Sequence, residues 1–174
     1  MRLPCAAAAM FALLSPVIAQ AQESRAQLSA GYSYARSEGE SLHGWTASLS
    51  LGRGGALSLV AEATEHYGTL QGTDLTRLSL FAGPRLGFGG GSPRPFVQVL
   101  AGLVRTSASI STGTIKISET ASDLGGAAGA GLDFRLGERW SLRLQGDYVL
   151  VKADPDTLKD PRASVSAVYR LGGK

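Results

Sequence analysis

The sequence predicts an all-β protein, an eight-stranded antiparallel up-and-down transmembrane β-barrel, and three features point to it. Eight segments of about ten residues alternate apolar and polar side chains, which is the period of a strand and the length that a tilted membrane-crossing strand needs. The connections between them alternate between longer polar stretches and short turns. The 174 residues include 23 glycines, which disfavour long helices and suit strands and turns.

The clearest of these segments is Trp140–Val151, WSLRLQGDYVLV. Its leucines fall on one face with Tyr148, and Arg143, Gln145 and Asp147 fall on the other. In a soluble protein the apolar face would meet a core and the charged face would meet water. In a closed membrane barrel the apolar face meets lipid and the charged face meets the lumen. The rest of the chain favours the second arrangement.

The first 21 residues predict a cleavable secretory signal peptide. Arg2 precedes an apolar run from Ala6 to Ala19, and an A-x-A motif ends at Ala21. A membrane anchor is the alternative, but the run is short and Pro16 interrupts it. We therefore expect cleavage after Ala21 and a barrel domain over residues 22–174.

Composition limits the partners of this chain. Its net charge is only +3 and its basic residues are scattered, which argues against a nucleic-acid partner. The one cysteine, Cys5, lies in the predicted signal, as suits an exported protein that does not depend on disulfides. The chain has no cysteine–histidine spacing typical of a metal site, and we expect no metal and no cofactor.

Each of the first four segments has one apolar face. These faces are Leu28, Ala30, Tyr32 and Tyr34 in Ala26–Arg36; Trp45, Ala47, Leu49 and Leu51 in Leu42–Gly52; Leu57, Leu59, Ala61 and Ala63 in Gly55–His66; and Leu78, Leu80, Ala82 and Leu86 in Asp74–Phe88. Pro84 weakens the fourth segment, because proline cannot donate a hydrogen bond to a neighbouring strand.

The last four segments repeat the pattern with one exception. The segment Arg94–Thr106 is apolar on both faces, and we favour an outward orientation for Val97, Val99, Ala101 and Leu103. The other apolar faces are Leu132, Phe134 and Leu136 in Leu124–Leu136; Leu142, Leu144, Tyr148 and Leu150 in Trp140–Val151; and Val165, Ala167, Tyr169 and Leu171 in Ala163–Leu171.

The connections and the aromatic residues predict the orientation of a membrane barrel. Such barrels have longer loops outside and short turns in the periplasm, with an aromatic band at each membrane interface. The expected loops are Ser37–Ser41, Tyr67–Thr73, Ser107–Asp123 and Lys152–Arg162, and the expected turns are Arg53-Gly54, Gly89–Pro93 and Gly137–Arg139. The expected bands are Tyr32, Tyr34, Trp45, Tyr67 and Tyr148 near the loops, and Phe88, Phe96, Trp140 and Tyr169 near the turns.

The inward faces predict a charged lumen. They carry Glu62, Asp133 and Asp147 with Arg77, Arg85, Arg135, Arg143 and Arg170. Eight strands enclose a space that side chains can fill, and buried charges must pair. We expect an ionic side-chain network that closes the lumen; a narrow channel through the same charges is the alternative.

Catalytic signals are weak. The two histidines are His43 and His66, and Ser41 shares a face with His43. His66 follows Glu65, but adjacent strand residues face opposite sides and do not form a dyad easily. We assign no catalytic residue and expect the protein not to be an enzyme.

Short motifs along the chain carry a resemblance to a known family. They are Gly31-Tyr32-Ser33-Tyr34, Gly44-Trp45 with Ser48, Tyr67-Gly68, Gly83-Pro84-Arg85, Pro95-Phe96, GAGLD at 129–133, Arg143, QGDY at 145–148 and YRLG at 169–172. In this order and spacing they resemble the small bacterial outer-membrane β-barrel proteins related to the OmpA transmembrane domain. The chain departs from these proteins at its end, where RLGGK follows Tyr169 instead of a final aromatic residue.

The resemblance implies an integral protein of the cell outer membrane in a Gram-negative bacterium, with a structural or surface-interaction role. Its implied partners are outer-membrane lipids and the assembly machinery, and the sequence does not identify the partner of the loops. The resemblance supplies no catalytic, cofactor or metal residues. Besides the narrow channel, two alternatives stay open: a lipid-modifying barrel enzyme that uses His43 or His66, and a soluble exported barrel that binds an apolar ligand.

Overall fold

The computed structural model describes residues 25–37, 40–52, 56–70, 73–112, 115–152 and 157–171. The predicted signal peptide and its cleavage site lie outside these residues. The strands are β1 (Arg25–Ser37), β2 (Glu40–Gly52), β3 (Leu57–Leu70), β4 (Thr73–Gly87), β5 (Arg94–Thr112), β6 (Ile115–Arg135), β7 (Trp140–Lys152) and β8 (Thr157–Leu171). No helix among the described residues is long and apolar enough to cross a membrane.

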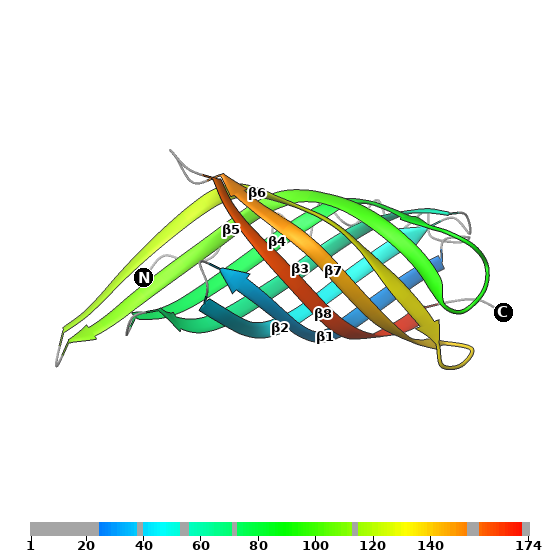
Figure 1. The fold of residues 1–174 in the computed structure, drawn as a ribbon, viewed down its shortest axis with the longest axis horizontal. Helices are drawn as coiled ribbons and strands as arrows, with labels where there is room; N and C mark the ends of the chain where they lie inside the picture. The colour runs from blue at the N-terminus through cyan, green and yellow to red at the C-terminus, as the bar shows by residue number, and fades with distance from the viewer. Residues whose placement is uncertain are drawn as a thin grey trace.

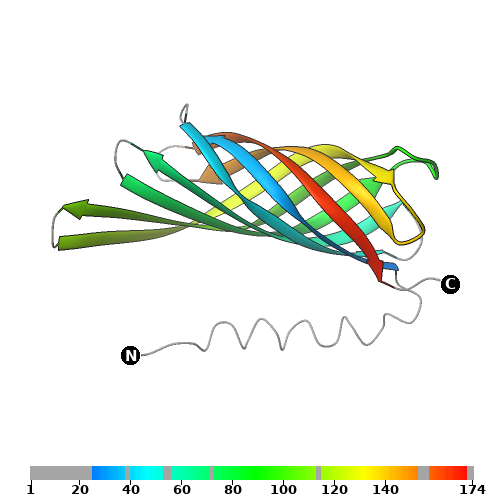
Figure 2. The ribbon, with the colours of Figure 1, turned by 90° about the horizontal axis from the view of Figure 1, so that it is seen from below.

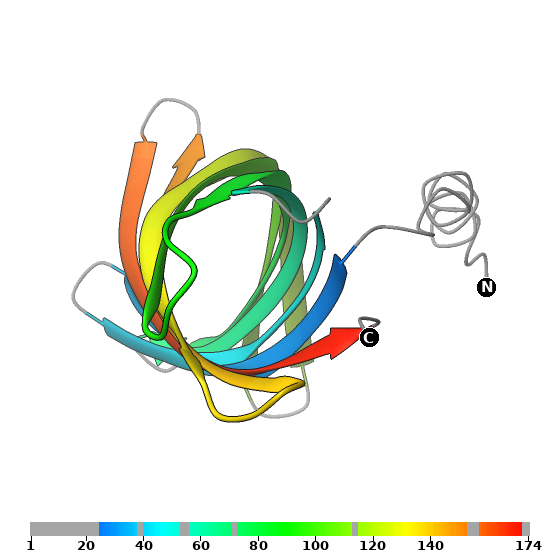
Figure 3. The ribbon, with the colours of Figure 1, turned by 90° about the vertical axis from the view of Figure 1, so that its right-hand side faces the viewer.

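The eight strands form one closed barrel, in which each strand is antiparallel to its neighbours (Figure 1). β1 closes the ring against β8, with pairs from Ala26–Leu171 to Ala35–Arg162. Figure 3 looks along the barrel and shows the ring of strands closed on itself. The predicted fold class is therefore confirmed.

The two ends of the barrel differ. The connections β2–β3, β4–β5 and β6–β7 lie at one end with Arg25 and Leu171, and we call it the short-turn end (Figure 1). The opposite end, the long-hairpin end, carries the remaining connections. There β5 and β6 extend well beyond the other strands (Figure 2).

The side chains are arranged inside out relative to a soluble protein. Along β5, Val99 is 62% exposed on the outer face, whereas the neighbouring Leu100 is 2% exposed in the lumen. The orientation predicted for this strand is confirmed. Exposed leucines on the outer wall and buried charges within are incompatible with a soluble barrel that binds an apolar ligand.

The loops predicted at the long-hairpin end are too long, because the strands extend into them. Most of Ser107–Asp123 continues β5 and β6 as a hairpin, and the last part of Lys152–Arg162 belongs to β8. Within β8, Pro161 lies just beyond the last β1–β8 pair, where β8 has β7 as its neighbour. Proline is tolerated at such an edge position because few ladder bonds are lost.

Pro84 has a similarly local effect. β4 runs through it, and the pairs Ala82–Ala101 and Arg85–Gln98 lie on either side of a lapse in the β4–β5 ladder. On its other side Pro84 is still paired with Leu59 of β3.

The two aromatic bands are present on the outer surface, with one correction. Tyr32, Trp45, Tyr67 and Tyr148 are exposed toward the long-hairpin end, and Phe88 and Trp140 toward the other. The rings of Trp140 and Tyr169 pack with centroids 4.9 Å apart. Phe96, however, points into the lumen and is buried. With Val97 on the outer face, the alternation of β5 turns Phe96 inward, so its position near the short-turn end did not make it a residue of the outer band.

Part of the lumen is apolar. One buried cluster, here called the apolar cluster, joins inward side chains of five consecutive strands. It contains Val60, Phe81, Leu100, Val104, Ala127, Val149 and Val151. The lumen thus contains apolar packing as well as charges, and the expectation of an ionic network describes only part of it.

A charge on the outer wall tests this arrangement. Leu144 lies on the outer face of β7, midway between Trp140 and Tyr148 of the two bands. We expect Leu144→Arg to lower the free energy of unfolding by about 2–4 kcal/mol, because the charge lies near the bilayer midplane. The control Leu136→Arg, beyond the Trp140 band, should cost no more than about 1 kcal/mol. Denaturant titration in phospholipid vesicles measures both, and equal losses would contradict a lipid-facing β7.

Candidate functional site

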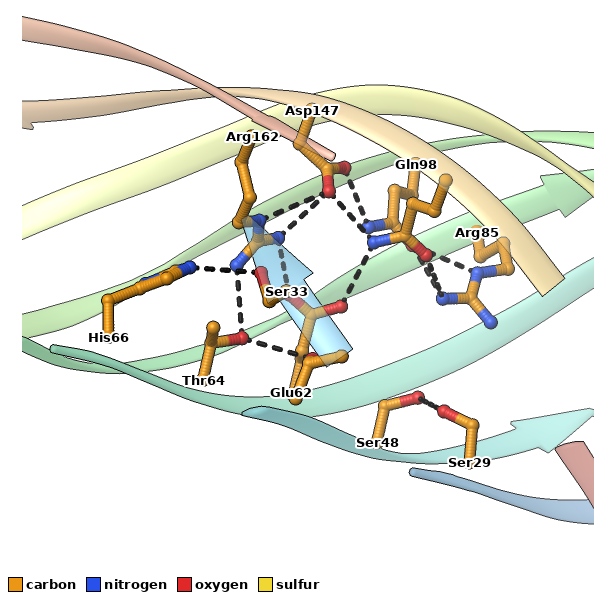
Figure 4. Close-up of polar contacts among 12 residues, drawn as sticks. Ser29, Ser33, Ser48, Glu62, Thr64, His66, Arg85, Gln98, Asp147 and Arg162 are labelled. Carbon is orange, nitrogen blue, oxygen red and sulfur yellow. Dashed lines mark hydrogen bonds and ion pairs between the residues drawn. The ribbon is translucent and has the colours of Figure 1, made fainter. Parts of the chain in front are cut away.

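The lumen contains a group of polar side chains that we call the central network, with Arg162 at its centre (Figure 4). Its members are Glu62, Thr64, Gln98, Gln145, Asp147 and Arg162, from strands β3, β5, β7 and β8. The alternation of each strand turns these side chains inward, and all six are buried. They meet across the lumen although they lie far apart in the sequence.

Arg162 binds two carboxylates. Its Nη2 atom lies 2.5 Å from Glu62 Oε1 and 2.9 Å from Asp147 Oδ2. Its Nη1 atom donates a hydrogen bond of 3.1 Å to Thr64 Oγ1. Charge-assisted hydrogen bonds of this kind are stronger than neutral ones, and a guanidinium can serve several acceptors at once.

Two glutamines complete the central network. Gln145 Nε2 donates to Glu62 Oε2 at 3.2 Å and to Asp147 Oδ2 at 2.8 Å. Gln98 Nε2 donates to Asp147 Oδ1 at 3.1 Å, while its Oε1 accepts from Arg85 Nε at 2.9 Å. The network therefore links β3, β7 and β8 and continues to β4 through Arg85.

Ion pairs flank the central network on both sides. Arg77 pairs with Asp160 near the long-hairpin end, and this contact spans the lumen from β4 to β8. Near the short-turn end, Arg143 holds Asp133 with two parallel bonds, Nε to Oδ1 at 2.7 Å and Nη2 to Oδ2 at 2.8 Å. The pairing of opposite charges expected for the lumen is thus present at three levels.

The predicted set of lumen charges needs two corrections. Arg135 is exposed where β6 ends and is not part of the buried set. Arg162 and Asp160 were assigned to a loop, although both continue the inward alternation of Ser164 and Ser166. Extending that period by two steps would have identified them. Arg170 is half-buried and donates to Ser141 Oγ at 3.3 Å.

The two histidines lie in different surroundings. Ser41 and His43 do not contact each other through a hydrogen bond; Ser41 pairs with the Tyr34 hydroxyl at 2.9 Å, and His43 Nδ1 pairs with the Tyr32 hydroxyl. His66 faces the lumen, where its Nε2 lies 2.9 Å from Ser33 Oγ.

The Ser33–His66 pair is buried on the lumen side of the wall. Glu65 faces outward and accepts hydrogen bonds from Trp45 and Tyr67. Its separation from His66 onto the opposite face agrees with the expectation that the two form no dyad. Within the described part of the chain, no three histidine, cysteine, aspartate or glutamate side chains gather as metal ligands.

The central network predicts that the stability of the barrel depends strongly on Arg162. We expect Arg162→Met to lower the free energy of unfolding by about 3–5 kcal/mol, because it leaves two buried carboxylates without their cation. The control Arg105→Met, at an exposed position on β5, should change it by no more than about 0.5 kcal/mol.

Combining Arg162→Met with Glu62→Gln and Asp147→Asn should recover part of the loss, since the two amides carry no charge. Denaturant titration measures each variant. If Arg162→Met unfolded like the wild type, the central network would not be a source of stability.

Comparisons with known proteins agree with this architecture. The sequence matches the outer membrane protein beta-barrel domain over residues 5–170. A search of curated proteins finds no significant match.

Three solved structures illustrate the structural likeness. Ail of Yersinia pestis superimposes with a TM-score of 0.62 at 20% identity, covering 86% of this chain and 100% of that one. Neisserial surface protein A gives 0.54 at 21% identity, covering 86% and 97%. The N-terminal β-barrel domain of Pseudomonas aeruginosa OprF gives 0.57 at 17% identity, covering 86% and 98%. At these identities the likeness concerns the fold. With the family match over nearly its whole length, the chain belongs to the outer membrane protein beta-barrel domain family and is located in the cell outer membrane.

Proposed function

We propose that this protein is a non-catalytic outer-membrane barrel with a closed lumen, which acts through the surface of its long-hairpin end. The observation that carries the proposal is the central network, in which one buried arginine binds carboxylates from two other strands. We also propose that residues 1–21 are a signal peptide removed on export, and that the outer wall is in contact with outer-membrane lipids after insertion by the assembly machinery.

The contents of the lumen support closure over a narrow channel. An ion that crossed it would have to pass the central network and the apolar cluster, both of which are buried. Opening a path would separate Arg162 from Glu62 and Asp147, and leaving such charges unpaired in a lumen costs several kcal/mol. A channel of the same fold would instead keep a wetted path lined by polar groups.

The long-hairpin end supports an interaction role. β4 pairs with β5 as far as Asp74–Ser109, and β7 pairs with β6 from Lys152–Leu124. The segment 115–123 of β6 therefore pairs with β5 but, among the described residues, not with β7, and it projects past the barrel wall (Figure 2). Ail, which shares the fold, has been crystallised with the heparin analogue sucrose octasulfate, so a barrel of this kind can bind a ligand.

Conductance in planar lipid bilayers tests the closed lumen. We expect the purified wild-type barrel to give no steady, wide pore, because its lumen side chains are paired and packed. Arg162→Met should raise the frequency of conducting events, since it breaks the central network, whereas Arg105→Met should not. A steady, wide conductance of the wild type would overturn the proposal of a closed lumen.

Protease treatment of intact cells tests whether the long-hairpin end faces the outside of the cell. We expect cleavage in the β5–β6 or β7–β8 hairpin and protection of the three connections at the short-turn end, since barrels of this class keep their short turns in the periplasm. Permeabilised cells provide the control, because both ends are then accessible. Cleavage of intact cells at the short-turn end alone would show the opposite orientation and contradict a role for the hairpin outside the cell.

A further inference from the structure

We infer that the lumen holds, at its short-turn end, a binding site for a small tetrahedral oxyanion of the phosphate class. At this end, arginines outnumber carboxylates among the described residues that line the lumen cavities. Two small cavities open there, and the described charged residues that line them are Arg85, Arg94, Arg135, Arg143 and Arg170 together with one carboxylate, Asp133. Asp133 is already bound by Arg143 through two hydrogen bonds.

The cavities have the size of a small ion. Each has a volume of about 70 Å³, and they share Gln27, Arg94 and Asp133 in their walls. One buried water needs roughly 10–15 Å³ of such space, so each cavity has room for several waters or one tetrahedral oxyanion. Both are too small for a drug-sized ligand, which fills some hundreds of Å³.

Arg85 is the cation that most needs a partner. Its side chain lines the first cavity and is only 4% exposed. Its Nε and Nη2 atoms donate to Gln98 Oε1, and Nη2 also donates to Gln145 Oε1 at 3.5 Å. Both acceptors belong to neutral amides. Its Nη1 atom is buried and has no hydrogen-bond partner among the described residues. Figure 4 shows this guanidinium at the edge of the network, away from Arg162.

Arg143 adds a second guanidinium, which lies over the same aromatic ring as Arg85. The carbon of the Arg85 guanidinium lies 4.6 Å from the centroid of the Phe96 ring, and that of Arg143 lies 5.0 Å from it. Both side chains line the first cavity, but the one carboxylate there, Asp133, is held by Arg143. The electron-rich ring of Phe96 attracts both cations without neutralising them.

An oxyanion would supply an acceptor for the unpartnered Nη1 of Arg85. Guanidinium groups bind phosphate and sulfate through parallel N–H donors, and Arg85, whose Nη1 donor is unused, lines the first cavity. The anion would enter from the short-turn end, because the central network lies behind Arg85 and closes the path through the barrel. We therefore assign a free aqueous oxyanion, and not a lipid headgroup, as the ligand.

Titration with inorganic phosphate tests the site in the full mature barrel, folded in a nonionic detergent that contains no lipid phosphate. We expect phosphate to raise the thermal unfolding midpoint in a saturable way, relative to chloride at equal ionic strength. Arg85→Gln should weaken phosphate binding about tenfold or more, since it removes a charged donor. Arg36→Gln, an exposed arginine near the opposite end, should leave binding unchanged and serves as the matched control.

A second variant gives an effect of opposite sign. Asp133→Asn removes the carboxylate that competes for the same arginines, so we expect tighter phosphate binding. Line broadening of the phosphate ³¹P signal measures affinity independently of stability, and heat-dependent gel migration confirms that each variant is folded. Equal, non-saturating stabilisation of the wild type and Arg85→Gln would overturn the site. So would stabilisation that requires anionic phospholipid and is absent with free phosphate. Neither result would affect the proposal of a closed lumen, which conductance tests separately.

Discussion

The structure depends on one constraint: charges inside a narrow membrane barrel must find their partners inside it. Water can serve the two ends, but the middle of the lumen is packed with side chains. Arg162 meets this constraint by binding carboxylates from β3 and β7, and the glutamines occupy the remaining carboxylate oxygens. An isolated carboxylate at either position would be costly, because burial removes its hydration. These contacts link the four strands that carry the network, β3, β5, β7 and β8.

The lumen is filled by apolar side chains as well as by paired charges. Inward side chains of β3 to β7 form the apolar cluster, which needs no polar partner. Glycines on the inner face make room for larger neighbours: a Cβ at Gly131 would collide with the Phe96 ring, and one at Gly129 would collide with Asp147. Small residues on β6 therefore allow an aromatic ring and a carboxylate from adjacent strands to fill the lumen.

The outer wall meets a different requirement. Its leucines and valines are exposed over the middle of the strands, and the tyrosines and tryptophans lie toward the ends. Their polar atoms have partners there, such as the Glu65 carboxylate beside Trp45 and Tyr67. A barrel with these two surfaces is stable only where hydrocarbon surrounds it, which agrees with its membership of an outer-membrane family.

Local alternation determined most of the fold. Because a strand turns successive side chains to opposite faces, the sequence by itself indicated eight strands, their outer faces and most of the inward charges, including Glu62, Asp147 and Arg143. The same rule was not carried far enough at two places. With Val97 facing outward it turns Phe96 inward, away from the outer aromatic band. The eighth segment was predicted to begin at Ala163, so the inward positions Asp160 and Arg162 were assigned to a loop.

Only the tertiary structure decided which inward charges meet. Glu62 and Arg162 are one hundred residues apart in the chain, and no local pattern relates them. Their contact across the lumen depends on the closure of β1 against β8 and on the stagger of all eight strands. The same closure placed Arg85 beside two neutral glutamines instead of a carboxylate. Side-chain period is a local property of the backbone, whereas pairing across a barrel depends on how the whole ring closes.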